Sequence, residues 1–171
     1  MLKKTLLKQR KADRIPVLII ENDADHWLII RSVLSQCFPE VEPIWVNNAA
    51  QAVTYLENAS LSKRKLPWLI LLELHLPRPK DGWSLISLIK GNPQHQHIPL
   101  IVLSHSQDRQ DINQAYTNNG ASYIVKPTTY HQWMKCIYSF RRYWWELVTL
   151  PLHFNLKERI SAEPTPSAVS L

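Results

Sequence analysis

Five short apolar runs, each followed by polar residues, recur along the chain. They span residues 16–20, 43–46, 68–72, 100–103 and 123–125. Short runs rich in branched apolar side chains are typical of strands buried on both faces of a parallel sheet. The pattern therefore predicts five buried strands whose carboxyl ends are polar.

Segments with helical spacing separate these runs. After the first run, Asp23 is a suitable N-cap for a helix that Pro39 ends. Trp27, Ile30 and Cys37 recur at helical spacing between these two residues. Similar patterns predict four more helices, over about residues 49–57, 83–89, 108–118 and 129–147.

The alternation of strands and helices predicts an α/β domain with a parallel sheet and right-handed crossovers. Ligands of such sheets gather at the carboxyl ends of the strands. With the strand order 2-1-3-4-5, the first and third strands are neighbours where the order reverses. The polar side chains at the strand ends then converge on one pocket, which would hold Glu21, Asn22, Glu73, Ser104 and Lys126.

Composition narrows the possible function classes. The chain of 171 residues is long enough for one domain with tails. Much of the net charge of +6 comes from residues 3–14 and 63–65, and such basic runs are usually solvated linkers. Since no helix-turn-helix, zinc-finger or RNA-binding signature accompanies them, nucleic-acid binding is not expected.

Further features of the sequence bear on other classes. No run is long and apolar enough to cross a membrane, and the basic N-terminus lacks a secretory apolar core, so we expect a cytoplasmic protein. Cys37 and Cys136 fit no metal or disulfide spacing and are expected to be reduced, buried thiols. His95 and His97 are expected to be solvated in a loop, whereas His105, next to Ser104, is expected to lie at the rim of the pocket. With only three glycines and no phosphate loop, a flavodoxin-like nucleotide-binding enzyme is a weak alternative.

Four motifs together resemble the response regulator receiver domain, the CheY-like family of two-component signalling. They are LIIEND, LILLELHLPRPKDG, IVLSHS and ASYIVKP, and they follow one another at the separations found in that family. The resemblance covers roughly residues 15–145. It implies a flavodoxin-like, CheY-like (βα)5 sandwich of three layers with strand order 2-1-3-4-5. It also implies a signalling module that is not an enzyme and that works with a sensor histidine kinase or another signalling protein.

The resemblance assigns a role to each strand-end residue. Glu21 and Asn22 match an acidic pair that holds Mg²⁺, and the backbone carbonyl of His75 matches a further metal ligand. Glu73 matches the aspartate that accepts a phosphoryl group and that also helps to hold Mg²⁺. Ser104 and Lys126 match the residues that grip the phosphoryl oxygens, and Tyr123 matches an aromatic residue that rotates inward after the transfer.

Two of these positions depart from the family pattern. Glu73 is one methylene longer than aspartate, about 1.5 Å, and a misplacement of about 1 Å can cost roughly a hundredfold in rate. Asn22 removes an anionic oxygen from a site where Mg²⁺ prefers carboxylates. We therefore expect weak or absent Mg²⁺ binding and little or no phosphorylation, although a conventional phosphate-accepting receiver stays an alternative. Glu73 is then either an acid in a structural ion pair with Lys126 or, if it reaches Ser104 and Lys126 together, a mimic of the phosphorylated state.

Aromatic residues at the end of the last predicted helix suggest contacts beyond the domain. Tyr143, Trp144 and Trp145 follow two arginines, in a tail similar to that of small stand-alone receivers, including those paired with phytochrome kinases. These aromatics either cover the core or form a protein interface, including that of a homodimer. We predict a basic extension over residues 1–14, a receiver domain over 15–148, and a C-terminal extension over 149–171 whose end is disordered.

Overall fold

A parallel five-stranded sheet forms the middle layer of the computed structural model, which describes residues 14–61, 65–120 and 122–150. The strand order is β2-β1-β3-β4-β5, as predicted. The strands are β1 (Ile15–Ile20), β2 (Val41–Val46), β3 (Leu69–Leu72), β4 (Leu100–Ser104) and β5 (Ser122–Val125). Since β1 and β3 are neighbours, residues that follow them lie side by side at one edge of the sheet.

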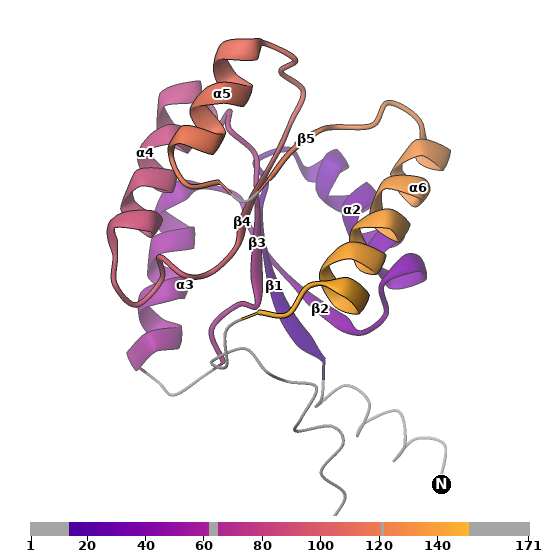
Figure 1. Cartoon of the computed structure of the whole chain (residues 1–171), viewed down its shortest axis with the longest axis horizontal. Coiled ribbons are helices and arrows are strands. Elements are labelled where there is room, and N and C mark those ends of the chain that lie inside the picture. Colours follow the sequence, from indigo (N-terminus) through magenta and orange to yellow (C-terminus); the bar gives the residue numbers. More distant parts are fainter. Residues whose placement is uncertain (1–13, 62–64, 121, 151–171) are drawn as a thin grey trace, which may run out of the picture.

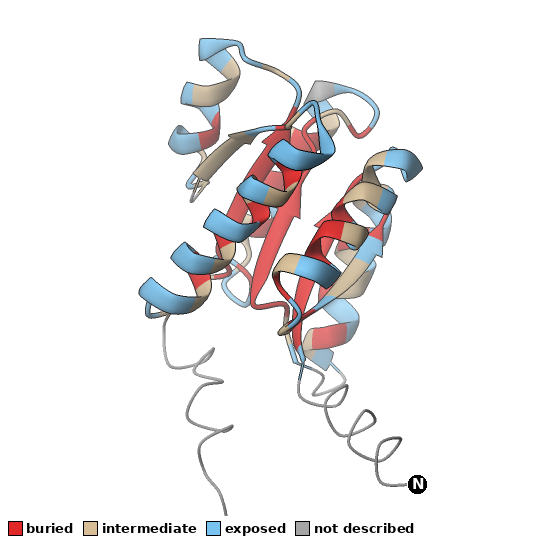
Figure 2. Ribbon diagram, turned by 90° about the vertical axis from the view of Figure 1, so that its right-hand side faces the viewer, coloured by how far each residue is buried: buried red, intermediate tan, exposed pale blue. Residues whose placement is uncertain are grey.

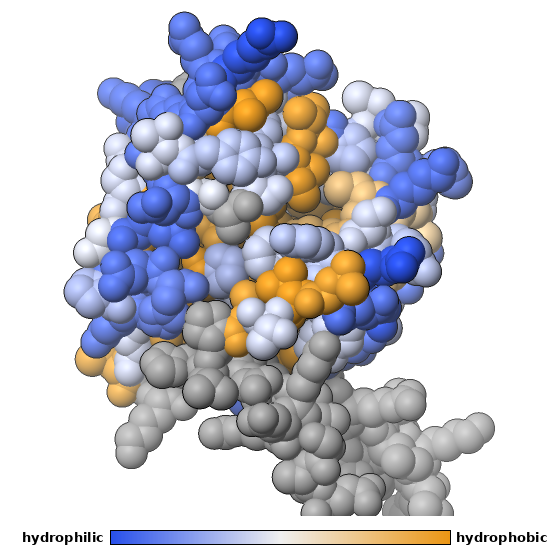
Figure 3. Space-filling model, in the orientation of Figure 1, coloured by the Kyte–Doolittle hydropathy of each residue, from blue (hydrophilic) through white to orange (hydrophobic). Residues whose placement is uncertain are grey.

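Helices cover both faces of the sheet (Figure 1). One face carries α2 (Ala24–Cys37) and α6 (Tyr130–Arg141), which pack against each other. The other face carries α3 (Ala49–Leu61), α4 (Pro79–Gly91) and α5 (Arg109–Thr117). The outer surface over α5, at the top of the view, is largely hydrophilic (Figure 3). This is the three-layer sandwich that the sequence predicted.

The apolar runs form the buried centre of the sheet (Figure 2). Every residue of β1, β3 and β4 is buried, whereas the edge strands β2 and β5 are only partly covered. Continuous apolar runs are what strands covered on both faces require. The three central strands therefore form a rigid base for the residues at their carboxyl ends.

Side-chain caps fix where two helices begin. Asp23 Oδ1 accepts hydrogen bonds from the backbone N–H groups of Asp25 (2.8 Å) and His26 (3.1 Å), as its position before α2 predicted. At α6, Thr129 and Gln132 form a reciprocal capping box. The cap of α2 matters for the site, because it sets the direction in which the first helical turn leaves β1.

Helices α3 and α4 are longer than predicted. α3 continues to Leu61, and α4 already begins at Pro79. In the first turn of α4, a Cβ added to Gly82 would lie 2.2 Å from the carbonyl oxygen of Leu74. A glycine is therefore required for α4 to pack this closely against the loop after β3, and the sequence alone does not reveal that contact.

The predicted final helix over residues 129–147 is confirmed in its extent, but its last part is π-helical rather than α-helical. α6 ends at Arg141, and a π-helical segment, η1 (Arg142–Leu147), follows it. Trp144 is buried, and the ring of Trp145 lies 5.9 Å from that of Trp68. Both indoles thus cover the core of their own chain. Tyr143 is 54% exposed, and its role as an interface residue stays a prediction.

Arg141 ties the π-helical segment to the body of the domain. Its guanidinium contacts Glu40, after α2, at 2.5 Å and Glu146, in η1, at 2.5 Å. Two carboxylates on one planar guanidinium fix its orientation. The C-terminal end of the described chain is therefore joined to the start of β2 by an ion-pair network as well as by packing.

The prediction that His95 is solvated is wrong. Its side chain is buried, and its Nε2 lies 2.9 Å from Ser60 Oγ on α3. Ser60 in turn donates to the carbonyl of Leu56 at 3.0 Å. His95 therefore fastens the loop before β4 to the inner side of α3, a contact between segments far apart in the sequence.

The burial of His95 predicts a dependence of stability on pH. Burial lowers the pKa of His95 below its ordinary value, with a further contribution from the nearby His97. Stability from the neutral imidazole is therefore present above about pH 6.5, the unfolded value, and is lost as pH falls through the folded pKa. Urea unfolding at several pH values should show a steeper acid loss for the wild type than for His95→Gln. Equal slopes would mean that His95 does not titrate differently in the folded chain.

Several predictions fall partly or wholly outside the described residues. Residues 1–13 and 151–171 lie outside, and with them most of the two predicted extensions, so the boundaries at 14/15 and 148/149 stay predictions. Among the described helices, none has the length and apolar character needed to span a membrane. Cys37 and Cys136 are free thiols, although both are half-buried rather than fully buried.

Candidate functional site

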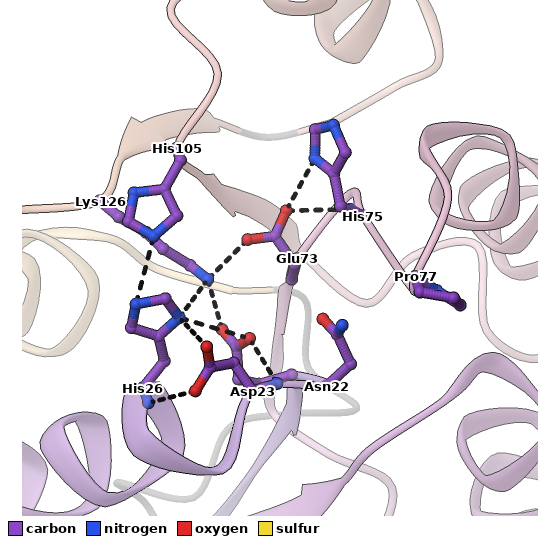
Figure 4. Close-up of a pocket in the computed structure, with 9 residues that line it drawn as sticks. Asn22, Asp23, His26, Glu73, His75, Pro77, His105 and Lys126 are labelled. Carbon is purple, nitrogen blue, oxygen red and sulfur yellow. Dashed lines mark hydrogen bonds and ion pairs between the residues drawn. The ribbon is translucent and has the colours of Figure 1, made fainter.

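The residues at the strand ends surround one pocket of about 320 Å³. The β1–β3 pairing brings its two acids together, since the Glu73 amide donates to the carbonyl of Ile20 at 2.9 Å. Residues from four strand ends and from α2 line it, as Figure 4 shows. They are Glu21, Asn22, Asp23, His26, Glu73, His75, Pro77, His105 and Lys126.

Lys126 lies at the centre of the site. Its Nζ is 2.6 Å from Glu21 Oε2, 2.5 Å from Glu73 Oε2 and 3.3 Å from His26 Nδ1. An ammonium has three N–H donors, so these three acceptors occupy all of them. We call these four residues the lysine cluster. Its two carboxylates and its ammonium are almost fully buried, at 2%, 5% and 3% exposure.

The Glu73 carboxylate contacts both predicted phosphate-gripping residues. Its Oε1 accepts a hydrogen bond from Ser104 Oγ at 2.9 Å, and its Oε2 faces Lys126. The backbone N–H of His75 also donates to Oε1 at 2.9 Å. The added methylene thus places the carboxylate between Ser104 and Lys126 at once, which was the condition set for a mimic of the phosphorylated state.

The two carboxylates have opposite pKa shifts. Burial raises the pKa of Glu73, but the charge of Lys126 and the hydrogen bonds from His75, Lys126 and Ser104 outweigh it, so the pKa lies below the ordinary value. For Glu21, burial dominates over the attraction of Lys126, and its pKa is raised. Of these two acids, Glu73 is therefore the one that is held more firmly in its ionised form.

Tyr123 on β5 points toward the loop that follows β4. Its hydroxyl donates to the backbone carbonyl of Ser106 at 2.9 Å. Ser106 Oγ also donates to Asp111 Oδ2 at 2.5 Å, and so pins the same loop to α5. The loop over residues 105–108 is therefore held from β5 and from α5, directly beside the Ser104–Glu73 contact.

Three residues that line the pocket, Asp23, His26 and Pro77, were not predicted as members of the site, and His105 was placed only at its rim. Asp23 and His26 line the pocket, and the predicted rim residue His105 lies with its Nε2 3.2 Å from His26 Nε2. His26 follows the N-cap Asp23 by three residues, so the first turn of α2 carries it to the sheet edge. That spacing was the only available signal, and it does not distinguish a site residue from a solvated one.

Trp45 of β2 contacts the backbone of the site. Its indole N–H donates to the carbonyl of Glu21 at 2.8 Å. Its ring stacks on that of Trp27, with centroids 5.4 Å apart and planes inclined by 8°. Since Trp45 is partly exposed, this stacked pair links the end of β1 to the surface.

The predicted metal ligands do not fit Mg²⁺ in this arrangement. The ammonium of Lys126 lies between the two carboxylates that a metal ion would have to share. Asn22 is exposed, and in Figure 4 it lies across the pocket from Lys126. Over the described parts of the chain, no three His, Cys, Asp or Glu side chains are grouped so that they could hold a metal ion. Mg²⁺ requires near-octahedral oxygen ligands, and Lys126 supplies none.

Comparison with known proteins identifies relatives of this chain. The family model of the response regulator receiver domain matches residues 17–138. A probable methanogenesis regulatory protein, FilR2 of Methanothrix harundinacea, is 28% identical over 132 residues, which are 77% of this chain and 84% of FilR2. The response regulator Rcp1 of Synechocystis is 29% identical over 136 residues, covering 79% of this chain and 92% of Rcp1.

Solved structures of the same kind share the fold. The phosphorylated cyanobacterial phytochrome response regulator RcpA has a TM-score of 0.72 at 27% identity, over 81% of this chain and 99% of RcpA. The Mn²⁺-bound form of Rcp1 has a TM-score of 0.70 at 28% identity, over 80% of this chain and 99% of Rcp1. Both neighbours are similar to this chain over nearly their whole length.

Proposed function

This chain belongs to the response regulator receiver domain family of two-component signalling, and from that premise we propose that Glu73 stands permanently in place of a phosphorylated aspartate. The chain is related to phytochrome response regulators. In our proposal it signals through protein contacts and does not depend on phosphoryl transfer. A sensor histidine kinase or another signalling protein is the partner class that the family implies.

The position of the Glu73 carboxylate is the observation that supports this proposal. It accepts from Ser104 at 2.9 Å and pairs with Lys126 at 2.5 Å, the two residues that the family uses to grip a phosphoryl group. Hydrogen bonds to an ionised acceptor are worth roughly 1.5–3 kcal/mol. The glutamate therefore offers Ser104 and Lys126 an anionic partner in place of a phosphoryl group, without a covalent modification.

A purely structural ion pair is the competing interpretation. It explains the Lys126 contact, yet it gives no reason for the bond from Ser104 or for the placement of Tyr123 against the Ser106 carbonyl. A phosphoryl mimic accounts for all three. The metal and transfer roles of Glu21, Asn22 and His75 are not needed in this function, because Lys126 already supplies a positive charge that both buried acids share.

Shortening Glu73 separates the two interpretations. In Glu73→Asp the charge is kept, but the carboxylate is withdrawn by one methylene and cannot reach both partners. We expect the amide hydrogen exchange rate of residues 105–108 to rise by roughly 10- to 100-fold. This is the change that corresponds to the loss of one charge-assisted hydrogen bond. Glu73→Gln, which keeps the length and loses the charge, should also release the loop.

The exposed Glu42 on β2 supplies the matched control. Glu42→Asp and Glu42→Gln should leave exchange in the loop unchanged. If Glu73→Asp keeps full protection while Glu73→Gln loses it, charge alone matters and the structural ion pair is the correct interpretation. Stoichiometric labelling of wild-type Glu73 by acetyl phosphate would also reject the proposal.

A further inference from the structure

Two histidines connect segments that the strand order alone does not join. His26 is in the first turn of α2, and His105 directly follows Ser104 at the end of β4. Their Nε2 atoms are 3.2 Å apart, and their ring centroids are separated by 4.8 Å. In Figure 4 both rings lie on the Lys126 side of the pocket, opposite Asn22 and Pro77.

Lys126 fixes the direction of the hydrogen bonds through this pair. An ammonium only donates, so His26 Nδ1, 3.3 Å from Nζ, must accept and carries no proton. A neutral imidazole then has its proton on Nε2, and this N–H donates to His105 Nε2. His105 must in turn carry its proton on Nδ1. The chain of bonds therefore runs outward from Lys126 through His26 to His105.

Two carboxylates compete for the same His26 nitrogen. Nδ1 lies 3.5 Å from Asp23 Oδ2 and 3.8 Å from Glu21 Oε1, and both distances are longer than its 3.3 Å contact with Lys126 Nζ. Glu21 Oε1 already accepts from the Asp23 amide, and Asp23 caps α2 through its other oxygen, Oδ1. The shortest contact of Nδ1 is thus with Lys126, which favours the outward direction.

His105 lies between two residues that already anchor its loop. Ser104 before it is bonded to Glu73, and Ser106 after it accepts from Tyr123. The histidine bridge reaches the loop by a different route, since it starts from Lys126 and passes through α2. The loop is therefore linked to the lysine cluster twice, once through Glu73 and once through His26.

We propose that His26 and His105 are positioning residues that couple Lys126 to the loop over residues 105–108. The inference rests on the proposed function, in which Glu73 holds the loop over residues 105–108 in one conformation. It adds the first turn of α2 to the part of the domain that is held in this way. A displacement of the ammonium breaks the bridge as well as the Glu73 contact. The first turn of α2 and the loop after β4 consequently move together.

The protonated nitrogen of each ring tests the proposal directly. At about pH 8, above the ordinary histidine pKa of about 6.5, nitrogen–proton correlation spectra should show His26 protonated at Nε2 and His105 at Nδ1. The Nδ1–H form is the less common tautomer of a free imidazole, so His105 is the decisive residue. The exposed His131 on α6 is the internal control and should show the common form. An Nδ1 proton on His26, or an Nε2 proton on His105, would overturn the inference.

Variants of His26 test the coupling itself. His26→Leu removes both bonds, so we expect His105 to return to the common tautomer and amide exchange in the loop to rise up to about tenfold. His26→Gln offers an acceptor and a donor of its own and should restore protection, whereas His131→Gln should change nothing. Unchanged exchange in a folded His26→Leu variant would contradict the coupling. The outcome is separable from the Glu73 test, because these tautomers are read in a chain where Glu73 is intact.

Discussion

Replacing Lys126 with methionine is expected to lower the free energy of unfolding by about 3–5 kcal/mol at neutral pH, the largest effect of any single substitution considered. Methionine keeps most of the apolar stem, but Glu21 and Glu73 lose the ammonium that lies 2.6 and 2.5 Å from them. Two buried carboxylates then face each other without a counter-charge. Denaturant unfolding, followed by circular dichroism, measures the loss.

The pH dependence identifies the cause of that loss. Without Lys126, burial and mutual repulsion raise the pKa of both carboxyls above the unfolded value of about 4.3. The folded variant then binds more protons than the unfolded chain, so its stability should increase as pH falls from neutral toward that value. In the wild type, where the pKa of Glu73 is lowered because Lys126 outweighs burial, the contribution of Glu73 is instead lost below that pH.

Lys90→Met is the matched control for this experiment. Lys90 is half-buried, and its ammonium donates to the carbonyls of Gln96 and Ile98 rather than to acids. Its replacement should lower the free energy of unfolding by less, and the stability of this variant should not increase as the pH falls. In the Lys126→Met background, Glu21→Gln with Glu73→Gln should recover most of the loss at neutral pH. A Lys126→Met protein as stable as the wild type would show that the cluster is not an ion-pair centre.

Reversing the two departures from the family pattern should restore phosphoryl transfer. With Mg²⁺ and acetyl phosphate, we expect the double variant Glu73→Asp with Asn22→Asp to be labelled at least about a hundredfold faster than the wild type. The shorter acid leaves room for the phosphoryl group, and the second substitution returns an anionic oxygen for the metal. Intact-mass spectrometry over time measures the rate, and calorimetric titration measures Mg²⁺ binding.

The single variants show how the two effects combine. Asn22→Asp alone improves the metal site but leaves Glu73 in contact with Ser104 and Lys126, so labelling should stay low. Glu73→Asp alone should be labelled only slowly, since the metal is held weakly. Glu73→Asn in the Asn22→Asp background should take no label and so locates the modification. Equal labelling of the wild type and the double variant would remove the claim that these two positions stop the chemistry.

The strands and the polar residues at their ends could be predicted because both depend on local pattern, whereas the strand order was implied by the resemblance to the receiver family. Apolar runs fix which segments are central strands, and the polar residue after each run must lie at the carboxyl edge. Glu73 and Lys126 could therefore be paired from the sequence, and the structure places them 2.5 Å apart. The replacement of the family's aspartate by Glu73 could be identified from the sequence for the same reason.

The histidines could not be predicted in the same way, because their roles depend on contacts between distant segments. His26 becomes part of the lysine cluster only when α2 leaves β1 at the angle set by its cap and meets the loop after β4. His95 is buried in the fold and contacts Ser60 on α3, a residue 35 positions away in the sequence. The π-helical segment was also missed, since α-helical spacing over residues 129–147 does not reveal where the hydrogen-bond pattern widens.

The stacked indoles of Trp27 and Trp45 give this domain an optical probe of its own interior. Because the Trp45 N–H is bonded to the carbonyl of Glu21, any shift at the end of β1 alters both that bond and the overlap of the two rings. Near-ultraviolet circular dichroism reports such overlap without a label. A difference spectrum against Trp45→Phe would separate this pair from the remaining tryptophans of the seven in the chain. The conformational state of the buried carboxylates can thus be followed in dilute solution, in real time, from light absorbed at the surface.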